Sequence, residues 1–237
     1  MIPNLLDNFN DYERIIEEHE KGDNFSLDIN LSPTCLLALI QYYQGKNRMQ
    51  TDFYELTGNN LFDIGNNNED LKDELYSHLD SDFGGEFLLR FIINEITNNI
   101  EEHSYCKNSY FLSKEYEDKL ELSFYDDGIS IPQSLNMAGI DIENDCDAID
   151  KAVNGVSEDK TNELLRGYGL NSSANLIVKR NRGSILIASR EGLLHIDNHD
   201  KKFKELKNNY IQGTLISALI NKSIVTDFYQ YMEHMKI

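Results

Sequence analysis

Residues 86–104 read EFLLRFIINEITNNIEEHS, and the rest of the chain is organised around them. Apolar side chains recur every three or four residues in this stretch, which predicts one helix with a buried stripe. The stripe consists of Leu89, Ile92, Ile93, Ile96 and Ile100. Glu95 and Asn99 are one turn apart beside the stripe, so a carboxylate and a carboxamide are expected on the same flank. Taken alone, this pair is also typical of a solvated helix flank.

A predicted strand follows and ends in an Asp-Gly turn. Residues 119–132 read KLELSFYDDGISIP. Apolar and more polar side chains alternate over residues 120–125, which predicts a strand buried on one face only. The strand runs directly into a turn that contains Asp126 and Gly128. The stretch NSYFLS at 108–113 predicts a second strand, and we expect the two strands to form a hairpin.

Two glycines precede a further helical stretch, RGYGLNSSANLI, at residues 166–177. Gly167 and Gly169 come just before the predicted helix. Free N–H groups and the helix dipole make such a helix start favourable for phosphate groups. Two more strands are predicted downstream, in RGSILIASR at 182–190 and in GTLISALI at 213–220.

The order of these motifs resembles the GHKL family of histidine kinase-like ATP-binding domains. The family includes histidine kinases, anti-sigma-factor serine kinases, type II topoisomerases, mismatch-repair ATPases and a heat-shock chaperone ATPase. The resemblance covers residues 82–221 and is closest in type to the anti-sigma-factor kinases. It implies an α+β fold of the Bergerat type, a two-layer α/β sandwich with helices on one face of a mixed sheet. A nucleotide would lie between the helix at 86–104 and a lid at about 133–166.

The resemblance also implies roles for individual residues. Asp126 would accept a hydrogen bond from the exocyclic amine of adenine, and Gly128 would let the backbone pass beneath the base. Asn99 would give Mg²⁺ an oxygen ligand, because this ion binds phosphates together with one or two protein groups. Glu95 would act as the catalytic residue that orients water or a substrate hydroxyl. Thr214 would close the floor of the pocket.

Further residues complete the expected ATP-binding set. They are Ser130, Ile131, Arg166, Gly167, Gly169 and Leu170. The backbone around the two glycines would hold phosphates. Arg166 would reach the terminal phosphate, although a solvated surface charge is an equally good interpretation. The chain departs from the family pattern at two positions, because Ser130 and Asn171 stand where the family has glycine.

Residues 1–80 are expected to form a small α/β module that ends in a bridging helix. Its predicted elements are a helix over 1–22, a strand over 25–29, a helix over 33–45, a strand within 49–56, a loop over 57–70 and a helix over 71–79. Ser32 and Pro33 suit the cap and first turn of the second helix. This strand and helix resemble part of the STAS-type domains that accompany anti-sigma-factor kinases. The ATP-binding domain is assigned to 81–221 and an amphipathic helix to 222–237.

The composition excludes several kinds of protein. The 237 residues include 22 basic and 41 acidic side chains, for a formal charge of -19. This balance argues against a broad nucleic-acid-binding face and against adhesion to anionic membranes. No run approaches the roughly 18 apolar residues of a membrane span, and the N-terminus lacks a signal-peptide pattern, so we expect a cytoplasmic protein. The three cysteines lack disulfide or zinc spacing, and the acidic run at 141–147 lacks the glycine and glutamate of a calcium loop.

Several functions fit these observations. One is a regulatory protein that uses Mg-ATP for phosphoryl transfer to a protein partner, or for switching that partner. The partner would be a STAS-type or other regulatory protein, and the chain itself could form a homodimer. The alternatives are an ATP-gated interaction or dimerisation module with little or no catalysis, a sensor histidine kinase-like catalytic domain, and a generic α/β domain that binds no nucleotide.

Overall fold

One antiparallel sheet lies at the centre of the molecule. The structure is a computed structural model, and it describes residues 3–21, 31–45, 62–63, 84–85, 87–155, 169–207 and 209–224. Within these residues the sheet has seven strands in the order β1-β2-β3-β7-β4-β5-β6, and each adjacent pair is antiparallel. The strands are β1 (Phe62–Asp63), β2 (Ser109–Glu115), β3 (Lys119–Asp126), β4 (Ser184–Arg190), β5 (Gly192–Ile196), β6 (Lys201–Glu205) and β7 (Ile211–Asn221).

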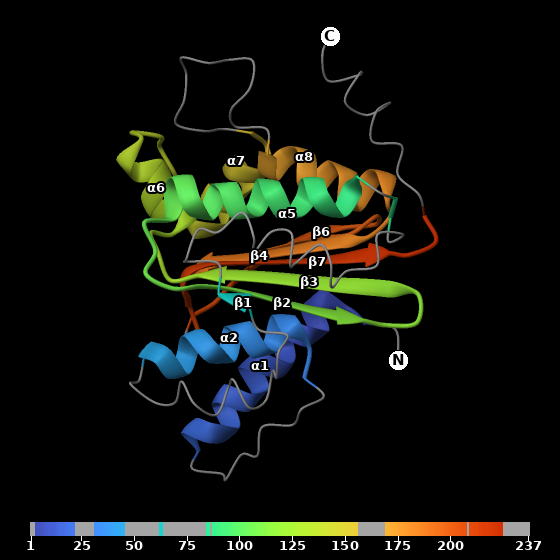
Figure 1. Cartoon of the computed structure of the whole chain (residues 1–237). Coiled ribbons are helices and arrows are strands. Elements are labelled where there is room, and N and C mark those ends of the chain that lie inside the picture. The colour runs from blue at the N-terminus through green and yellow to red at the C-terminus, as the bar shows by residue number, and fades with distance from the viewer. Residues whose placement is uncertain are drawn as a thin grey trace.

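Helices cover both faces of the sheet (Figure 1). The face that we term the back face carries α1 (Leu5–Glu20) and α2 (Pro33–Gly45). The other, front face carries α5 (Leu88–Asn99) with its π-helical continuation η3 (Ile100–Ser104), α6 (Ile131–Met137), α7 (Asp145–Val153), and α8 (Gly169–Asn175) with its π-helical continuation η4 (Leu176–Arg180). The described elements therefore form three layers.

The α+β class that the sequence predicts is confirmed, but one detail of the expected sandwich is wrong. We expected a mixed sheet, whereas the described strands pair only in antiparallel fashion. β3 and β4 do run in the same direction, but β7 lies between them and pairs antiparallel with both. The hairpins β2-β3, β4-β5 and β5-β6 have connections too short for the crossover that a parallel pair needs. The helices described within residues 81–221 lie on one face, as expected, whereas α1 and α2 of the predicted N-terminal module pack on the second face.

Each face of the sheet has its own apolar core. The front core joins Ile96 of α5 to Phe124 of β3, and the back core joins Leu37 of α2 to Leu215 of β7. Because both faces are covered, residues 120–126 of β3 are all buried. The prediction of a strand buried on one face only is therefore wrong. The same two cores show that α1 and α2, from the predicted N-terminal module, share the sheet with the predicted ATP-binding domain.

Most elements predicted within the described residues are present. The apolar stripe of the helix at 86–104 is buried, and β2 and β3 form the predicted hairpin. The hydroxyl of Ser32 accepts a hydrogen bond from the N–H of Cys35 at 3.2 Å, which confirms the predicted cap of α2. Outside the described residues lie the strands predicted at 25–29 and within 49–56, the helix predicted over 71–79, and the part of the helix predicted over 222–237 that follows residue 224.

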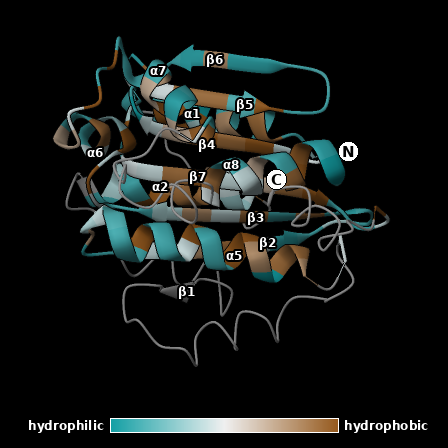
Figure 2. Ribbon diagram, turned by 90° about the horizontal axis from the view of Figure 1, so that it is seen from above, coloured by the Kyte–Doolittle hydropathy of each residue, from teal (hydrophilic) through white to brown (hydrophobic). Residues whose placement is uncertain are grey.

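Three strands were not predicted. β1 is only two residues long and lies in the predicted loop at 57–70. β5 and β6 extend the sheet beyond β4. β6 reads KKFKE, and Figure 2 shows it as mostly hydrophilic, so it lacks the alternation by which strands are recognised. Lysines on an edge strand discourage pairing with another chain.

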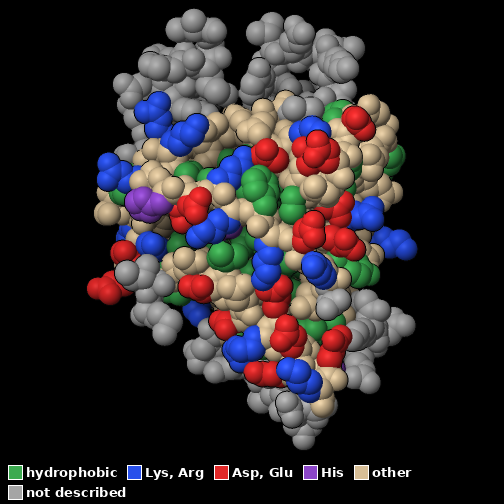
Figure 3. All heavy atoms as spheres, turned by 180° about the vertical axis from the view of Figure 1, so that it is seen from behind, with side chains coloured by type: hydrophobic (Ala, Val, Ile, Leu, Met, Phe, Trp, Pro, Cys, Tyr) green, Lys and Arg blue, Asp and Glu red, His purple; other side chains and the backbone are tan. Residues whose placement is uncertain are grey.

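Charged side chains of both signs mix on the molecular surface. Figure 3 shows lysines and arginines interspersed with acidic side chains on the face opposite to the view of Figure 1. Lysines of β6 form ion pairs with other elements, Lys201 with Asp150 of α7 and Lys204 with Glu13 of α1. Among the described residues, no helix is long and apolar enough to cross a membrane.

Candidate functional site

The front face of the sheet changes from apolar to polar at one end. The strand register places Asp126 of β3 opposite Thr214 of β7, and Thr214 opposite Ser189 of β4. Side chains two residues apart in a strand point to the same face. The neighbouring row on that face consists of Phe124, Ile216 and Ile187, which belong to the front core. Asp126, Thr214 and Ser189, which we term the polar row, therefore lie on the side of the sheet that carries α5.

Asp126 is a buried carboxylate with spare hydrogen-bonding capacity. Its side chain is 5% exposed, and Oδ1 accepts a hydrogen bond from the N–H of Gly128 at 3.0 Å. Burial raises the pKa of the Asp126 carboxyl to about 7; the Gly128 bond lowers this pKa and the nearby Asp127 raises it. A carboxylate can accept about four hydrogen bonds. Asp126 can therefore take further donors from a ligand.

The neighbouring Asp127 has a different role. Its Oδ1 accepts the N–H groups of Lys107 at 2.8 Å and Asn108 at 2.9 Å, and its Oδ2 accepts the side-chain amide of Asn108 at 2.6 Å. These bonds fix the segment between η3 and β2. Of the two adjacent aspartates, the geometry favours Asp126 as the one that is available to a ligand.

Two glycines are required where backbones meet beside Asp126. A Cβ on Gly128 would lie 2.1 Å from the carbonyl oxygen of Ser104, at the end of η3. Gly213 has a φ of 79°, and a Cβ there would lie 1.9 Å from the carbonyl oxygen of Asp126. Glycine is the residue that permits both the positive φ and such close approach. Within the protein itself, Gly128 thus allows the Asp-Gly turn to pack against the helix end.

Glu95 and Asn99 lie together on the flank of α5 and are both partly buried. The start of α8 reaches this pair. A Cβ on Gly169 would lie 2.2 Å from Oε2 of Glu95 and 3.8 Å from Nδ2 of Asn99. Burial raises the pKa of the Glu95 carboxyl, and the negative charge of Glu102 adds to this shift. The fold therefore brings Gly169 to a predicted pair of site residues that is distant from it in sequence.

Ser189 connects the polar row to the start of α6. Its hydroxyl accepts the N–H of Ile131 at 3.0 Å, donates to the carbonyl of Gly213 at 2.7 Å and lies 3.3 Å from Oγ1 of Thr214. Ser130 is buried and caps α6, accepting the N–H of Gln133 at 3.3 Å. Ser189 was missed in the sequence. Its only signal is a serine at the end of an apolar strand, and the sequence does not reveal which residues of other strands lie beside it.

The remaining predicted residues lie near α8. Leu170 packs against the front core. Asn171, which stands where the resembling family has glycine, donates from its side chain to the carbonyl of Val153 at 2.7 Å and so ties α8 to α7. Arg166 and Gly167 lie outside the described residues. Their predicted contacts with phosphates stay predictions.

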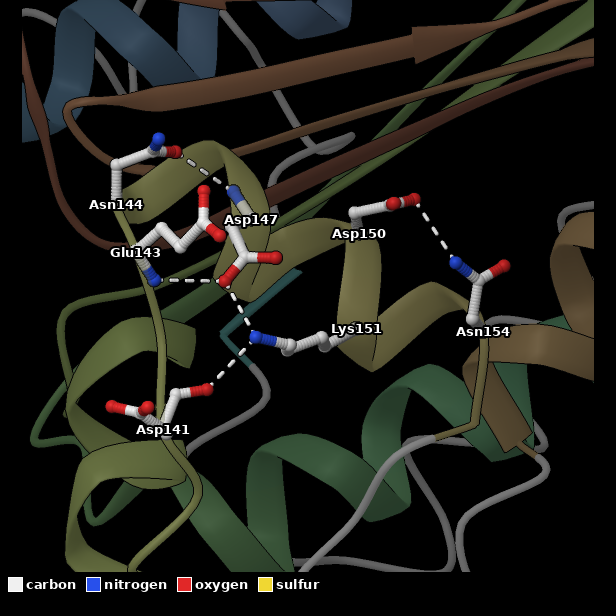
Figure 4. A network of polar contacts seen from close by, with 7 residues as sticks. All are labelled: Asp141, Glu143, Asn144, Asp147, Asp150, Lys151 and Asn154. Carbon is white, nitrogen blue, oxygen red and sulfur yellow. Dashed lines mark hydrogen bonds and ion pairs between the residues drawn. The ribbon is translucent and has the colours of Figure 1, made fainter.

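The acidic run at 141–147 is held by a local network (Figure 4). Oδ2 of Asp147 accepts hydrogen bonds from the ammonium group of Lys151 at 2.7 Å and from the N–H of Glu143 at 2.9 Å. Lys151 also donates to the carbonyl of Asp141 at 2.8 Å. In the part of the chain that the structure describes, no group of three or more His, Cys, Asp or Glu side chains could hold a metal ion.

The oxygen donors on α5 nevertheless fit Mg²⁺ in the presence of phosphates. Asn99 offers a side-chain carbonyl and Glu95 a carboxylate, and oxygen is the ligand atom that Mg²⁺ prefers. The start of α8 lies close to this pair, and only a residue without a Cβ fits there, because a Cβ at Gly169 would reach the Glu95 carboxylate. One or two protein oxygens are sufficient when phosphates and water complete the coordination.

Comparison with known proteins adds no relative to this picture, since no protein-family model and no curated protein matches the chain. The function is therefore inferred from the geometry and chemistry of the site.

Proposed function

We propose that the chain binds Mg-ATP on the front face, between the polar row and the Glu95–Asn99 pair. It would act as a regulatory protein of the histidine kinase-like type, which transfers a phosphoryl group to a protein partner or switches that partner. The proposal includes a Bergerat-type arrangement of the front half, with the nucleotide between α5 and the segment 133–166.

One observation carries the proposal. Gly169, the second glycine of the Gly-x-Gly segment, lies directly against Glu95 and Asn99 of α5. The segment expected to hold phosphates thus meets the residues expected to hold Mg²⁺ and orient the nucleophile. The Asp126 carboxylate lies on the same side of the sheet and has capacity for the exocyclic amine of adenine.

The site residues would divide the work between binding and chemistry. The Asp126 carboxylate accepts from the base and fixes its orientation, and Thr214 lies beside it at the pocket floor. Asn99 would provide its side-chain oxygen to a bound Mg²⁺, and that ion would supply positive charge to neutralise the phosphates. The Glu95 carboxylate orients the attacking hydroxyl or water. Burial raises the pKa of Glu95, which makes its carboxylate a stronger proton acceptor than an exposed one.

Isothermal titration with ADP and ATP, with and without Mg²⁺, tests the binding site. The wild-type protein should bind in a magnesium-dependent manner. Asp126→Asn should weaken binding about 100-fold, because the carboxylate acceptor is replaced by an amide. Asp118→Asn makes the same chemical change in the turn before β3 and should bind like the wild type. No measurable binding to the wild-type protein would refute the proposal.

Turnover of ATP tests the role of Glu95. Glu95→Ala should lower the rate of hydrolysis or phosphoryl transfer about 100- to 1,000-fold while nucleotide affinity stays nearly unchanged. Glu101→Ala, in the exposed part of η3, is the matched control. Unchanged turnover in Glu95→Ala would show that this residue does not orient the nucleophile.

A further inference from the structure

The hydroxyl of Ser189 has three hydrogen-bonding neighbours at the polar row. They are the N–H of Ile131 at 3.0 Å, the carbonyl oxygen of Gly213 at 2.7 Å and Oγ1 of Thr214 at 3.3 Å. Ser189 is fully buried, so these neighbours and not water satisfy it. A hydroxyl has one proton to donate and two lone pairs that accept. Its three neighbours therefore use its whole capacity.

The direction of each hydrogen bond follows by elimination. A carbonyl oxygen can only accept, so the single proton of Ser189 goes to Gly213. A backbone N–H can only donate, so Ser189 accepts from Ile131. With its proton already used, Ser189 can only accept from Thr214 as well. The hydroxyl proton of Thr214 is therefore directed at Ser189, away from Asp126 on the other neighbouring strand.

This direction decides what Thr214 can offer to a ligand. With its proton engaged, Thr214 has only lone pairs left, as has the ionised carboxylate of Asp126 beside it. Two adjacent acceptors match an exocyclic amine, which has two N–H groups. They mismatch a carbonyl oxygen at the same position of the base, because an acceptor would then face acceptors.

We propose that Ser189 is a positioning residue that holds Thr214 as a hydrogen-bond acceptor and thereby makes the site select 6-amino purines over 6-oxo purines. The inference rests on the proposed nucleotide site and adds its base specificity. Ser189 acts through Thr214. Without Ser189, the Thr214 hydroxyl can turn and donate its proton to a 6-oxo group.

Titration with ADP and inosine diphosphate tests the proposal, since the two bases differ in bearing a 6-amino or a 6-oxo group. The wild-type protein should prefer ADP. Ser189→Ala should lower the ratio of the two affinities about fivefold, which corresponds to one neutral hydrogen bond. The ratio is informative because a general loss of packing would weaken the binding of both diphosphates by the same factor. Ser217→Ala is the control. Ser217 is a fully buried serine of β7 on the back face, bonded to Ser123, and its loss should leave the ratio unchanged.

Thr214→Val provides a second route to the answer if Ser189→Ala does not fold. It removes the hydroxyl that Ser189 positions and should lower the same ratio by a similar factor. In the Thr214→Val background, Ser189→Ala should have no further effect on the ratio. An affinity ratio in Thr214→Val, or in a folded Ser189→Ala protein, that stays as large as in the wild type would overturn the inference and leave the nucleotide site standing. Failure of the wild-type protein to bind either diphosphate would overturn both.

Discussion

β3 carries two buried carboxylates on opposite faces of the sheet, and their surroundings differ sharply. Glu121 on the back face is fully buried and accepts four hydrogen bonds. The donors are the N–H of Thr34 at 3.0 Å, the hydroxyl of Thr34 at 2.6 Å, the side-chain amide of Asn8 at 3.0 Å and the hydroxyl of Tyr116 at 2.8 Å. Asp126 on the front face accepts one hydrogen bond from the described residues, at 3.0 Å from Gly128.

The difference separates a structural carboxylate from one that can bind a ligand. Glu121 joins the first turn of α2 and the side of α1 to the sheet, and a negative charge is favourable at a helix N-terminus. Its lone pairs are used within the protein. Asp126 is almost as deeply buried but keeps lone pairs for other donors. Burial alone therefore does not mark a functional carboxylate; the number of donors around it does.

The largest expected effect concerns Glu121. Glu121→Ala should lower the free energy of unfolding by about 3 kcal/mol or more, because buried donors on Thr34, Asn8 and Tyr116 lose their acceptor. Urea denaturation measures this loss, with Glu117→Ala in the exposed turn before β3 as control. The folded fraction should still bind ADP. A loss below about 1 kcal/mol would show that the Glu121 network does not hold the back helices.

Asp126→Asn should raise the free energy of unfolding at alkaline pH, whereas Glu121→Ala lowers it. The pKa of Asp126 is raised from 3.8 to about 7 in the folded protein. The protonated carboxyl group therefore makes its whole contribution to the free energy of unfolding below pH 4, and this contribution is lost as the pH rises through 7. The neutral amide avoids this loss. Asp126→Asn should therefore gain on the order of 2 kcal/mol over the wild type at pH 8 and little at pH 4.

Urea denaturation of the wild-type protein and Asp126→Asn at the two pH values tests this expectation. If the free energies of unfolding of the two proteins differed by the same amount at both pH values, the pKa of Asp126 would not be raised. Affinity of the wild type for ADP should also increase as the pH rises through 7, because the ionised carboxylate of Asp126 accepts a stronger hydrogen bond from the base than the protonated carboxyl group does.

The smallest effects on stability distinguish two glycines of the front face. Gly128→Ala brings a Cβ within 2.1 Å of a backbone oxygen of Ser104, which cannot easily move, and should cost about 2 kcal/mol of stability. Gly169→Ala brings a Cβ within 2.2 Å of the Glu95 carboxylate, which can turn aside, and should cost less than about 1 kcal/mol. Displacing Glu95 should nevertheless lower ATP turnover about tenfold. A stability loss in Gly169→Ala as large as in Gly128→Ala would remove this distinction between fold and site.

The sequence by itself determined the elements whose signals are local. The apolar stripe of α5, the cap of α2 at Ser32 and the hairpin of β2 and β3 all depend on residues a few positions apart, and all are present. Asp126 and the pair Glu95 and Asn99 became candidate site residues only through the order of several such motifs and the family resemblance which that order carries. Helical periodicity, capping and turn chemistry are properties of a short stretch, so they can be recognised without knowledge of the fold.

Only the tertiary structure decided which distant residues meet and which carboxylates are already satisfied. The alignment of Asp126, Thr214 and Ser189 depends on the insertion of β7 between β3 and β4, and no local pattern encodes that register. The alternation in β3 predicted an exposed Glu121, and its burial follows from α1 and α2 packing on the second face. Hydrogen-bond satisfaction and burial depend on the neighbours that folding supplies, and in this protein those neighbours come from distant parts of the chain.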